Sequence, residues 1–128
     1  MPRDSEANRY ARQIQFAPIG AEGHAAIAAS RVAVLGCGAL GTVAAEILAR
    51  AGAGEIRLID RDIVEWTNLQ RQSLYTEQDA IDSQSKAASA CEHLVAINSS
   101  IKIEPVVADV TSHNIREILR DVDFVVDA

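Results

Sequence analysis

The feature that most constrains the fold is a glycine motif between a short apolar run and an amphipathic segment. The run Val32–Leu35 has the length and composition of a buried strand. The motif that follows has the spacing G-x-G-x-x-G, with glycines at Gly36, Gly38 and Gly41. A glycine-rich turn that leads from a strand into a helix is typical of a nucleotide-binding βαβ unit.

Each glycine has a separate physical role in such a unit. Gly36 permits the tight turn, Gly38 lets the backbone approach phosphate oxygens, and Gly41 lets the helix pack closely on the sheet. The helix N-terminus offers N–H groups and a favourable dipole to an anion. Asp60 ends the next predicted strand, where a carboxylate can accept hydrogen bonds from ribose hydroxyls. The sequence therefore predicts a nucleotide site, and the missing GK[ST] ending excludes a Walker A loop.

Residues 1–30 are predicted to be a helical lead-in. Asn8 can cap a short helix that runs through Gln13, and Ala25–Ala29 can form a second helix. Two glycines are expected to break the chain between these helices, Gly20 and Gly23.

The helix after the glycine motif has one continuous apolar face. The apolar residues at helical spacing are Leu40, Val43, Ala44, Ile47, Leu48 and Ala51. Gly52 and Gly54 end this helix, and the strand EIRLID follows it. Residues 61–82 are mostly polar and are predicted to be irregular, a length that suggests a functional loop.

The remaining elements are predicted from helical and alternating spacing. A helix capped by Asp82 or Ser83 carries the apolar residues Ala87, Ala90, Cys91, Leu94 and Val95. An alternating strand covers Ile101–Val107, a helix capped by Thr111 or Ser112 turns Ile115, Ile118 and Leu119 inward, and a strand starts within Asp123–Ala128.

This order of elements predicts an α/β fold, a Rossmann-like doubly wound parallel sheet over residues 31–128. In the strand order 3-2-1-4 the third strand is an edge, which suits Pro105 because proline donates no ladder hydrogen bond. The fourth strand is expected to need a fifth beside it. We therefore expect the domain to be incomplete, either the N-terminal part of a longer protein or shielded by another chain.

Composition limits the class of protein further. A chain of 128 residues has room for one domain with a real core. The net charge of −6 argues against a nucleic-acid partner. No apolar run approaches membrane-spanning length, and Met1–Tyr10 lacks the apolar centre of a signal peptide. A cytoplasmic location is predicted.

Cysteine and histidine positions predict no metal site. Cys37 and Cys91 lie far apart in apolar segments and are expected to be buried free thiols. No CxxC pair is present, so neither a zinc site nor a dithiol site is encoded. The histidines share no ligand spacing.

The polar loop after Asp60 offers more positive charge than a dinucleotide needs. It carries Asn68, Arg71 and Gln72, and Lys86 starts the next helix. Arginine binds phosphate oxygens in a fork and lysine adds a point charge. A solvated charged loop is the alternative interpretation.

These segments together resemble one known family. The matching residues are Arg9-Tyr10-x-Arg12-Gln13, GCGALG at 36–41, Asp60-x-Asp62-x-Val64-Glu65-x-x-Asn68-Leu69-x-Arg71-Gln72, and Lys86. In order and spacing they resemble the activating enzymes typified by ThiF, MoeB, HesA and the ubiquitin-activating enzymes. The match covers nearly the whole chain, and the second loop is more specific than the glycine motif.

The resemblance implies an enzyme that uses ATP and Mg²⁺ to adenylate the C-terminal carboxylate of a ubiquitin-like or sulfur-carrier protein. It implies that Asp60 holds the ribose and that the backbone of Gly36, Gly38, Ala39 and Gly41 lies near the phosphates. Asn68, Arg71 and Lys86 would offset the phosphate charge, and Arg12 would act as an arginine finger on the neighbouring subunit's ATP, which implies a homodimer.

The chain departs from the family pattern in three places. Ala39 and Thr67 stand where many members have glycine and serine. The family's magnesium-binding aspartate is expected beyond Ala128, and Asp127 resembles the acid that precedes it. Neither Cys37 nor Cys91 matches the family's catalytic cysteine.

Two other functions are compatible with the glycine motif. An NAD-dependent oxidoreductase would use Asp60 on the ribose but leaves Asn68, Arg71 and Lys86 unexplained. A nucleotide-binding or dimerisation module without turnover would need no magnesium aspartate.

Overall fold

The fold is built on a four-stranded parallel sheet with the order β3-β2-β1-β4. A computed structural model describes residues 8–128, so the first seven residues of the predicted lead-in lie outside the described part. The strands are β1 (Arg31–Leu35), β2 (Glu55–Ile59), β3 (Lys102–Val106) and β4 (Phe124–Asp127). The predicted α/β fold, the strand order and the edge position of the strand that carries Pro105 are confirmed.

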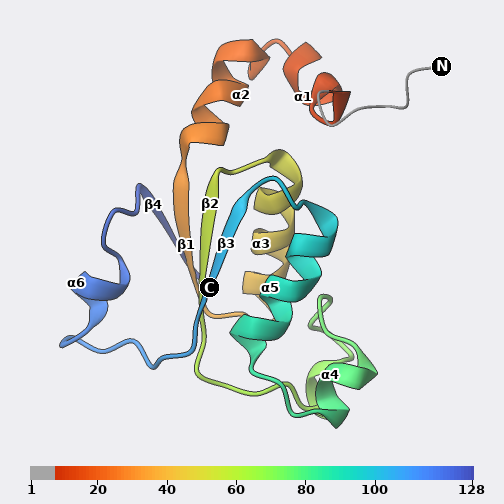
Figure 1. Ribbon diagram of the computed structural model, residues 1–128, viewed down its shortest axis with the longest axis vertical. Coiled ribbons are helices and arrows are strands. Elements are labelled where there is room, and N and C mark those ends of the chain that lie inside the picture. Colours follow the sequence, from red (N-terminus) through yellow and green to blue (C-terminus); the bar gives the residue numbers. More distant parts are fainter. Residues whose placement is uncertain (1–7) are drawn as a thin grey trace.

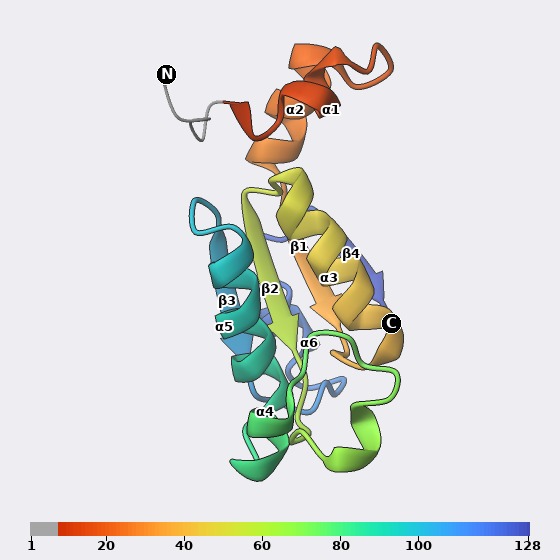
Figure 2. The same cartoon turned by 90° about the vertical axis from the view of Figure 1, so that its right-hand side faces the viewer.

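Seven helical segments that lie wholly within residues 8–128 accompany the sheet. They are α1 (Ala11–Gln15), α2 (Gly20–Ala29), α3 (Ala39–Ala51), the short 3-10 helix η2 (Trp66–Asn68), α4 (Glu77–Ile81), α5 (Lys86–Ile97) and α6 (Ile115–Ile118). Helices α3 and α5 cover one face of the sheet and α6 lies on the other (Figures 1 and 2). Within residues 8–128 no helix is both long enough and apolar enough to cross a membrane.

The two ends of the sheet carry different segments. Helices α1 and α2 lie beyond the end where β1 begins, whereas α4 and its loop lie beyond the end where β1 and β2 finish (Figure 1). Because all strands are parallel, the glycine loop and the polar loop after Asp60 meet at this second end.

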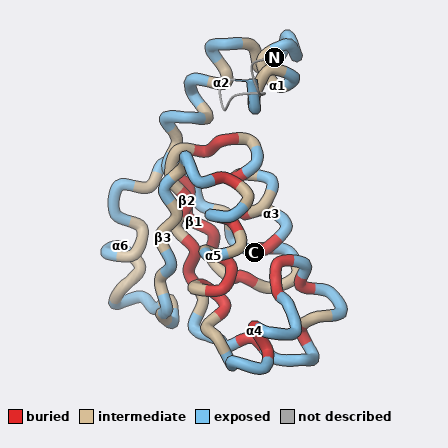
Figure 3. Tube along the Cα trace, turned by 45° about the vertical axis from the view of Figure 1, so that its right-hand side comes forward, coloured by how far each residue is buried: buried red, intermediate tan, exposed pale blue. Residues whose placement is uncertain are grey.

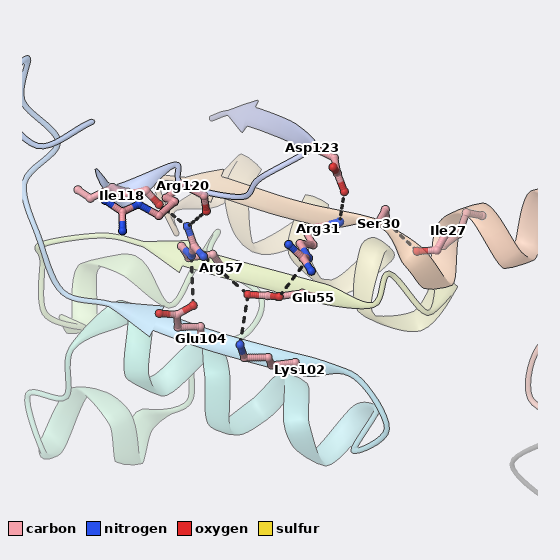
Figure 4. A network of polar contacts seen from close by, with 10 residues as sticks. All are labelled: Ile27, Ser30, Arg31, Glu55, Arg57, Lys102, Glu104, Ile118, Arg120 and Asp123. Atoms are coloured by element: carbon pink, nitrogen blue, oxygen red, sulfur yellow. Dashed lines mark hydrogen bonds and ion pairs between the residues drawn. The ribbon is translucent and has the colours of Figure 1, made fainter. Parts of the chain in front are cut away.

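The core lies where β1 and β2 pack on α3 and α5 (Figure 3). Its largest fully buried side chains include Ile56, Leu58, Ile59 and Leu94. On the other face of the sheet, Arg57 is the centre of a polar network that holds α6 (Figure 4). Arg57 pairs with Glu104 at 3.2 Å and donates to the carbonyls of Ile118 and Arg120.

The predicted apolar face of α3 faces the core only in part, because Leu48 packs against the core while the other large side chains point outward. The residues that α3 buries are Gly41, Thr42, Ala45 and Ala49. Leu40, Val43 and Ile47 are 75%, 45% and 62% exposed. Small residues face the sheet because α3 packs close against it, and the larger side chains form an outward stripe (defined here as Leu40, Val43 and Ile47).

Helix starts were the least accurate predictions. Helix α1 begins after Tyr10 without a side-chain cap, rather than at Asn8, and α2 begins at Gly20 and runs through Gly23. Helix α5 is capped by Ser85, whose Oγ accepts from the Ala88 N–H at 3.2 Å, rather than by Asp82 or Ser83.

Two further corrections concern short helices. The N-cap of α6 is Asn114 rather than Thr111 or Ser112. The loop predicted to be irregular contains η2 and α4, and α4 starts with a reciprocal capping box between Thr76 and Asp79. The Thr-x-x-acid spacing that marks such a box was present in the sequence.

Candidate functional site

The glycine loop is shaped by two glycines that the fold requires and one that it does not. Gly36 has φ +95°, and a Cβ on it would lie 2.7 Å from the backbone oxygen of Ala128. A Cβ on Gly41 would overlap the carbonyl oxygen of Gly36. A Cβ on Gly38 would meet only Gln72 Nε2, at an ordinary 3.9 Å. Packing therefore does not require a glycine at position 38, and the surface there is open.

The N-terminus of α3 opens onto this surface. Gly38 is the N-cap and offers no side chain to the first turn. Its carbonyl accepts from the N–H and the hydroxyl of Thr42, at 3.1 and 2.6 Å. The N–H groups of Ala39, Leu40 and Gly41 have no intrahelical acceptor, because they belong to the first turn. They can bind an anion, which the helix dipole also favours.

Asp60 fastens the glycine loop to the next loop. Its Oδ2 accepts from the Cys37 N–H and its Oδ1 from the Asp62 N–H, both at 2.8 Å. Each carboxylate oxygen retains capacity for a further donor. Asp60 therefore holds the loop and can also accept from a ribose, and only the second role was expected from the sequence.

Lys86 is a buried cation that has no carboxylate partner in the described part of the chain. It is 8% exposed at the start of α5, and its backbone N–H donates to the Asp62 carbonyl at 2.9 Å. Within residues 8–128 no acid lies close enough to pair with it. Its side chain lines a polar cleft of about 220 Å³, together with Asp62, Ile63, Glu65 and Asn68. A buried ammonium that lacks an internal counter-ion suits an anionic ligand.

Asn68 is positioned by the helix that carries it. Its Oδ1 accepts from the Glu65 N–H at 2.8 Å, which leaves the amide nitrogen available to the cleft. Arg71 is exposed, and its Nη1 donates to the Thr67 carbonyl at 3.0 Å. The structure thus brings Asn68 and Lys86 together at one cleft and places Arg71 on the short turn beside it.

Several buried residues that were not predicted as site residues hold the glycine loop and the polar loop after Asp60 in place. The hydroxyl of Tyr75 donates to the Cys37 carbonyl, and Leu74 lies in the core. Asp79 accepts from the Thr76 N–H at 2.8 Å and contacts His93 Nε2 at 2.7 Å. Burial opposes ionisation of Asp79, but these hydrogen bonds outweigh it and lower the pKa of its carboxyl.

Arg12 is the predicted site residue that the structure does not bring to the site. It lies exposed on α1, at the opposite end of the sheet from the glycine loop (Figure 1). Helix α1 is anchored there by neighbouring residues. Gln13 donates to the Ala51 carbonyl at 2.9 Å, and the Tyr10 hydroxyl accepts from Asn98 at 2.8 Å. Arg12 therefore has no access to the cleft of its own chain.

Cys37 lies inside the glycine loop but is not an available nucleophile. It is 2% exposed, and burial and then the Asp60 carboxylate raise the pKa of its thiol to about 12, against a smaller lowering by Lys86. Cys91 is half-buried, and burial also raises the pKa of its thiol. Both are free thiols, but the expected full burial holds only for Cys37.

No metal cluster is formed by the described part of the chain. No group of three or more histidine, cysteine, aspartate or glutamate side chains there is arranged to hold an ion. The cleft beside Lys86 has two acids, Asp62 and Glu65.

The fold and this site define a Rossmann-like protein with a polar cleft at the carboxyl edge of its sheet, where the buried Lys86 lies. The ThiF family profile matches residues 10–128. The chain belongs to the ThiF family.

Two curated relatives show how much of a whole protein is matched. The sulfur carrier protein ThiS adenylyltransferase of Bacillus subtilis is 50% identical over 120 residues, which cover 94% of this chain and 36% of that protein. The SAMP-activating enzyme E1 of Haloferax volcanii is 39% identical over 124 residues, covering 97% of this chain and 45% of that protein. The chain thus spans less than half the length of either relative.

Two solved structures have the same arrangement of elements. The dehydratase TcdA of E. coli, acting on tRNA N6-threonylcarbamoyladenosine and solved with ATP, has a TM-score of 0.86 and 31% identity, covering 98% of this chain and 51% of that one. E. coli MccB, solved with AMPCPP and MccA, has a TM-score of 0.81 and 31% identity, covering 100% of this chain and 39% of that one.

Proposed function

We propose that the protein carrying this chain uses ATP to adenylate the C-terminal carboxylate of a ubiquitin-like or sulfur-carrier protein. The observation that carries the proposal is the buried Lys86, unpaired within residues 8–128, in a polar cleft near the open N-terminus of α3. The Lys86 ammonium is a cation and the N-terminus of α3 carries a partial positive charge, and both attract a phosphate chain. The names of the sulfur-carrier adenylyltransferase and E1 relatives support the same reaction.

The proposed chemistry is a displacement at phosphorus. A carboxylate oxygen of the carrier attacks the α-phosphorus of ATP, and the bond from that phosphorus to the bridging oxygen breaks. The products are an acyl-adenylate and pyrophosphate.

The backbone at Gly36, Gly38, Ala39 and Gly41 would hold phosphate oxygens, and Asp60 would accept from the ribose. Asn68, Arg71 and Lys86 would offset charge on the leaving pyrophosphate, since such transfers depend on positioning and charge neutralisation.

We assign Arg12 to the ATP of a second copy of the chain. Its position at the far end of the sheet supports action in trans. The outward stripe of α3 supports a homodimer, because a contiguous exposed apolar surface marks an interaction site. ATP as a substrate supports a cytoplasmic location.

Mg²⁺ would accompany ATP, since this ion binds mainly through substrate phosphates and one or two carboxylates. The described residues show no cluster of three ligands for it.

ATP–pyrophosphate exchange by the full-length protein tests the reaction directly. Labelled pyrophosphate should be incorporated into ATP only when a carrier protein with a free C-terminal carboxylate is present. A carrier shortened at its C-terminus serves as the matched control. Absence of both exchange and ATP binding would refute the proposal.

Titration of ATP against NAD separates adenylation from oxidoreduction. The cleft beside Lys86 predicts tighter binding of ATP, and Lys86→Met should weaken ATP binding because it removes a charge-assisted contact. Preference for NAD, with no effect of Lys86→Met, would favour the oxidoreductase instead.

A further inference from the structure

Gln72 is buried beneath the glycine loop with one half of its amide unpartnered. The residue is 4% exposed, and its buried Oε1 has no hydrogen-bond partner among residues 8–128. Two hydrogen bonds hold the backbone of Gln72. The Gln72 N–H donates to the Asn68 carbonyl at 2.9 Å, and its carbonyl accepts from the Tyr75 N–H at 3.3 Å. The main chain of Gln72 is therefore held in place, and its side chain is buried.

The nitrogen half of the amide borders the space above Gly38. A Cβ on Gly38 would have Gln72 Nε2 as its nearest neighbour, at 3.9 Å. A ligand oxygen seated against Gly38 on this side comes close to the N–H groups of Gln72. The same surface is flanked by the open N–H groups of the first turn of α3.

We propose that Gln72 is a further nucleotide-binding residue, whose Nε2–H donates to a phosphate oxygen held against Gly38. This inference rests on the proposed function, because it takes ATP as the ligand. A glutamine amide carries both a donor nitrogen and an acceptor oxygen. Placing Nε2 beside the ligand therefore also buries Oε1. A buried acceptor without a donor destabilises the folded state. Local costs of this kind are typical of functional sites.

A near-isosteric substitution separates binding from structural support. Gln72→Met removes the donor and the unpartnered acceptor together. We expect an unchanged or higher Tm, because no buried acceptor remains unsatisfied. We expect the affinity for ATP to fall about ten- to hundredfold, the range for a hydrogen bond to a charged group.

Asn98→Leu is the matched control, because Asn98 is a fully buried amide whose bonds are satisfied. Its nitrogen donates to Tyr10 and to the Ala49 carbonyl, both at 2.8 Å, at the opposite end of α3 from Gly38. This variant should lose Tm and keep the ATP affinity of its folded fraction. Both measurements use the full-length protein, with thermal unfolding and ATP titration calorimetry.

The outcomes distinguish the inference from the proposed function. If the unsubstituted protein does not bind ATP, the proposed function fails and the inference fails with it. If the protein binds ATP and Gln72→Met binds equally well, only the inference is overturned. Failure of Gln72→Met to fold, or a lower Tm with unchanged affinity, also overturns it by showing a structural role.

Discussion

At the residue scale, the glycine motif separates into packing and ligand roles. Gly36 and Gly41 lie where a Cβ would collide with backbone atoms, whereas Gly38 lies where a Cβ has room. The motif thus contains two glycines that the fold requires and one, Gly38, that packing does not require, in line with the separate roles expected for them from the sequence.

Gly38→Ala should fold and lose ATP. The new methyl group meets only Gln72 Nε2, so we expect a Tm within a few degrees of the unsubstituted protein. The methyl group fills the space for a phosphate oxygen, so ATP affinity should fall at least about tenfold. Gly41→Ala should show the reverse: it should keep its ATP affinity and lose about 3 kcal/mol of unfolding free energy, because its methyl group would overlap the carbonyl oxygen of Gly36. Urea unfolding and calorimetry measure both, and equal ATP affinity in Gly38→Ala would contradict the assignment.

The thiol of Cys37 should make folding stability depend on alkaline pH. The folded pKa of about 12 lies above the ordinary value of 9.0, so the thiol's stabilising effect is fully present below pH 9. As the pH rises above 9 the unfolded chain releases this proton while the folded chain keeps it. Stability therefore falls by up to about 1.4 kcal/mol per pH unit through this group.

Cys37→Ala tests this linkage. Urea midpoints at pH 8 and pH 10 should differ less in the variant than in the unsubstituted protein. Burial raises the pKa of Tyr75 as well, so part of the loss of stability remains in the variant. An identical pH dependence in both proteins would show that Cys37 does not contribute.

At the element scale, the short helix α6 is held on the sheet by one polar side chain rather than by intrinsic helix propensity. Helix α6 is one turn long and buries no residue fully. Isolated helices of this length are unstable in water. Its attachment to the sheet depends on Arg57 in the middle of β2. Arg57 donates to the carbonyl of Ile118, the last residue of α6, and to the carbonyl of Arg120, two residues further on.

Arg57→Met should loosen α6 while the sheet remains folded. We expect a loss of about 1–3 kcal/mol, because charged hydrogen bonds to two carbonyls disappear and Glu104 loses its partner. Hydrogen exchange should quicken first in α6. Arg61→Met is the control, since Arg61 and Asp109 are 67% and 63% exposed and such a pair contributes about 0–1 kcal/mol. Equal effects of the two variants would refute the anchoring role of Arg57.

At the scale of the whole molecule, the predicted catalytic arginine and the cleft lie at opposite ends of one chain. Arg12 is on α1, and Lys86 opens α5 beside the glycine loop (Figure 1). A single chain therefore does not complete the proposed site. Two copies can complete it if each contributes Arg12 to the other.

Mixing two inactive variants tests this arrangement. Arg12→Ala and Lys86→Ala should each abolish most ATP–pyrophosphate exchange. After mixing and subunit exchange, one site of each heterodimer has both residues intact. Up to roughly a quarter of the original rate should return, because half of a random mixture is heterodimer with one of two sites restored. No recovery, with heterodimers shown to form, would place Arg12 outside the reaction.

The sequence by itself determined the sheet, its order and the position of the glycine loop. Strand length, the edge proline and turn chemistry are local signals, and right-handed crossovers allow few topologies for them. The same locality explains the missed starts of α1, α2 and α5, since several neighbouring polar residues could each serve as a cap.

Only the tertiary structure decided which surfaces and side chains face one another. The periodicity of α3 was correct, but close packing on the sheet selected Ala45 and Ala49 for the core and left Ile47 outside. The burial of Lys86 without a partner and the unsatisfied oxygen of Gln72 likewise depend on loops that are far apart in the sequence. Burial and hydrogen-bond satisfaction are properties of the assembled chain, because they depend on which distant groups exclude water from each atom.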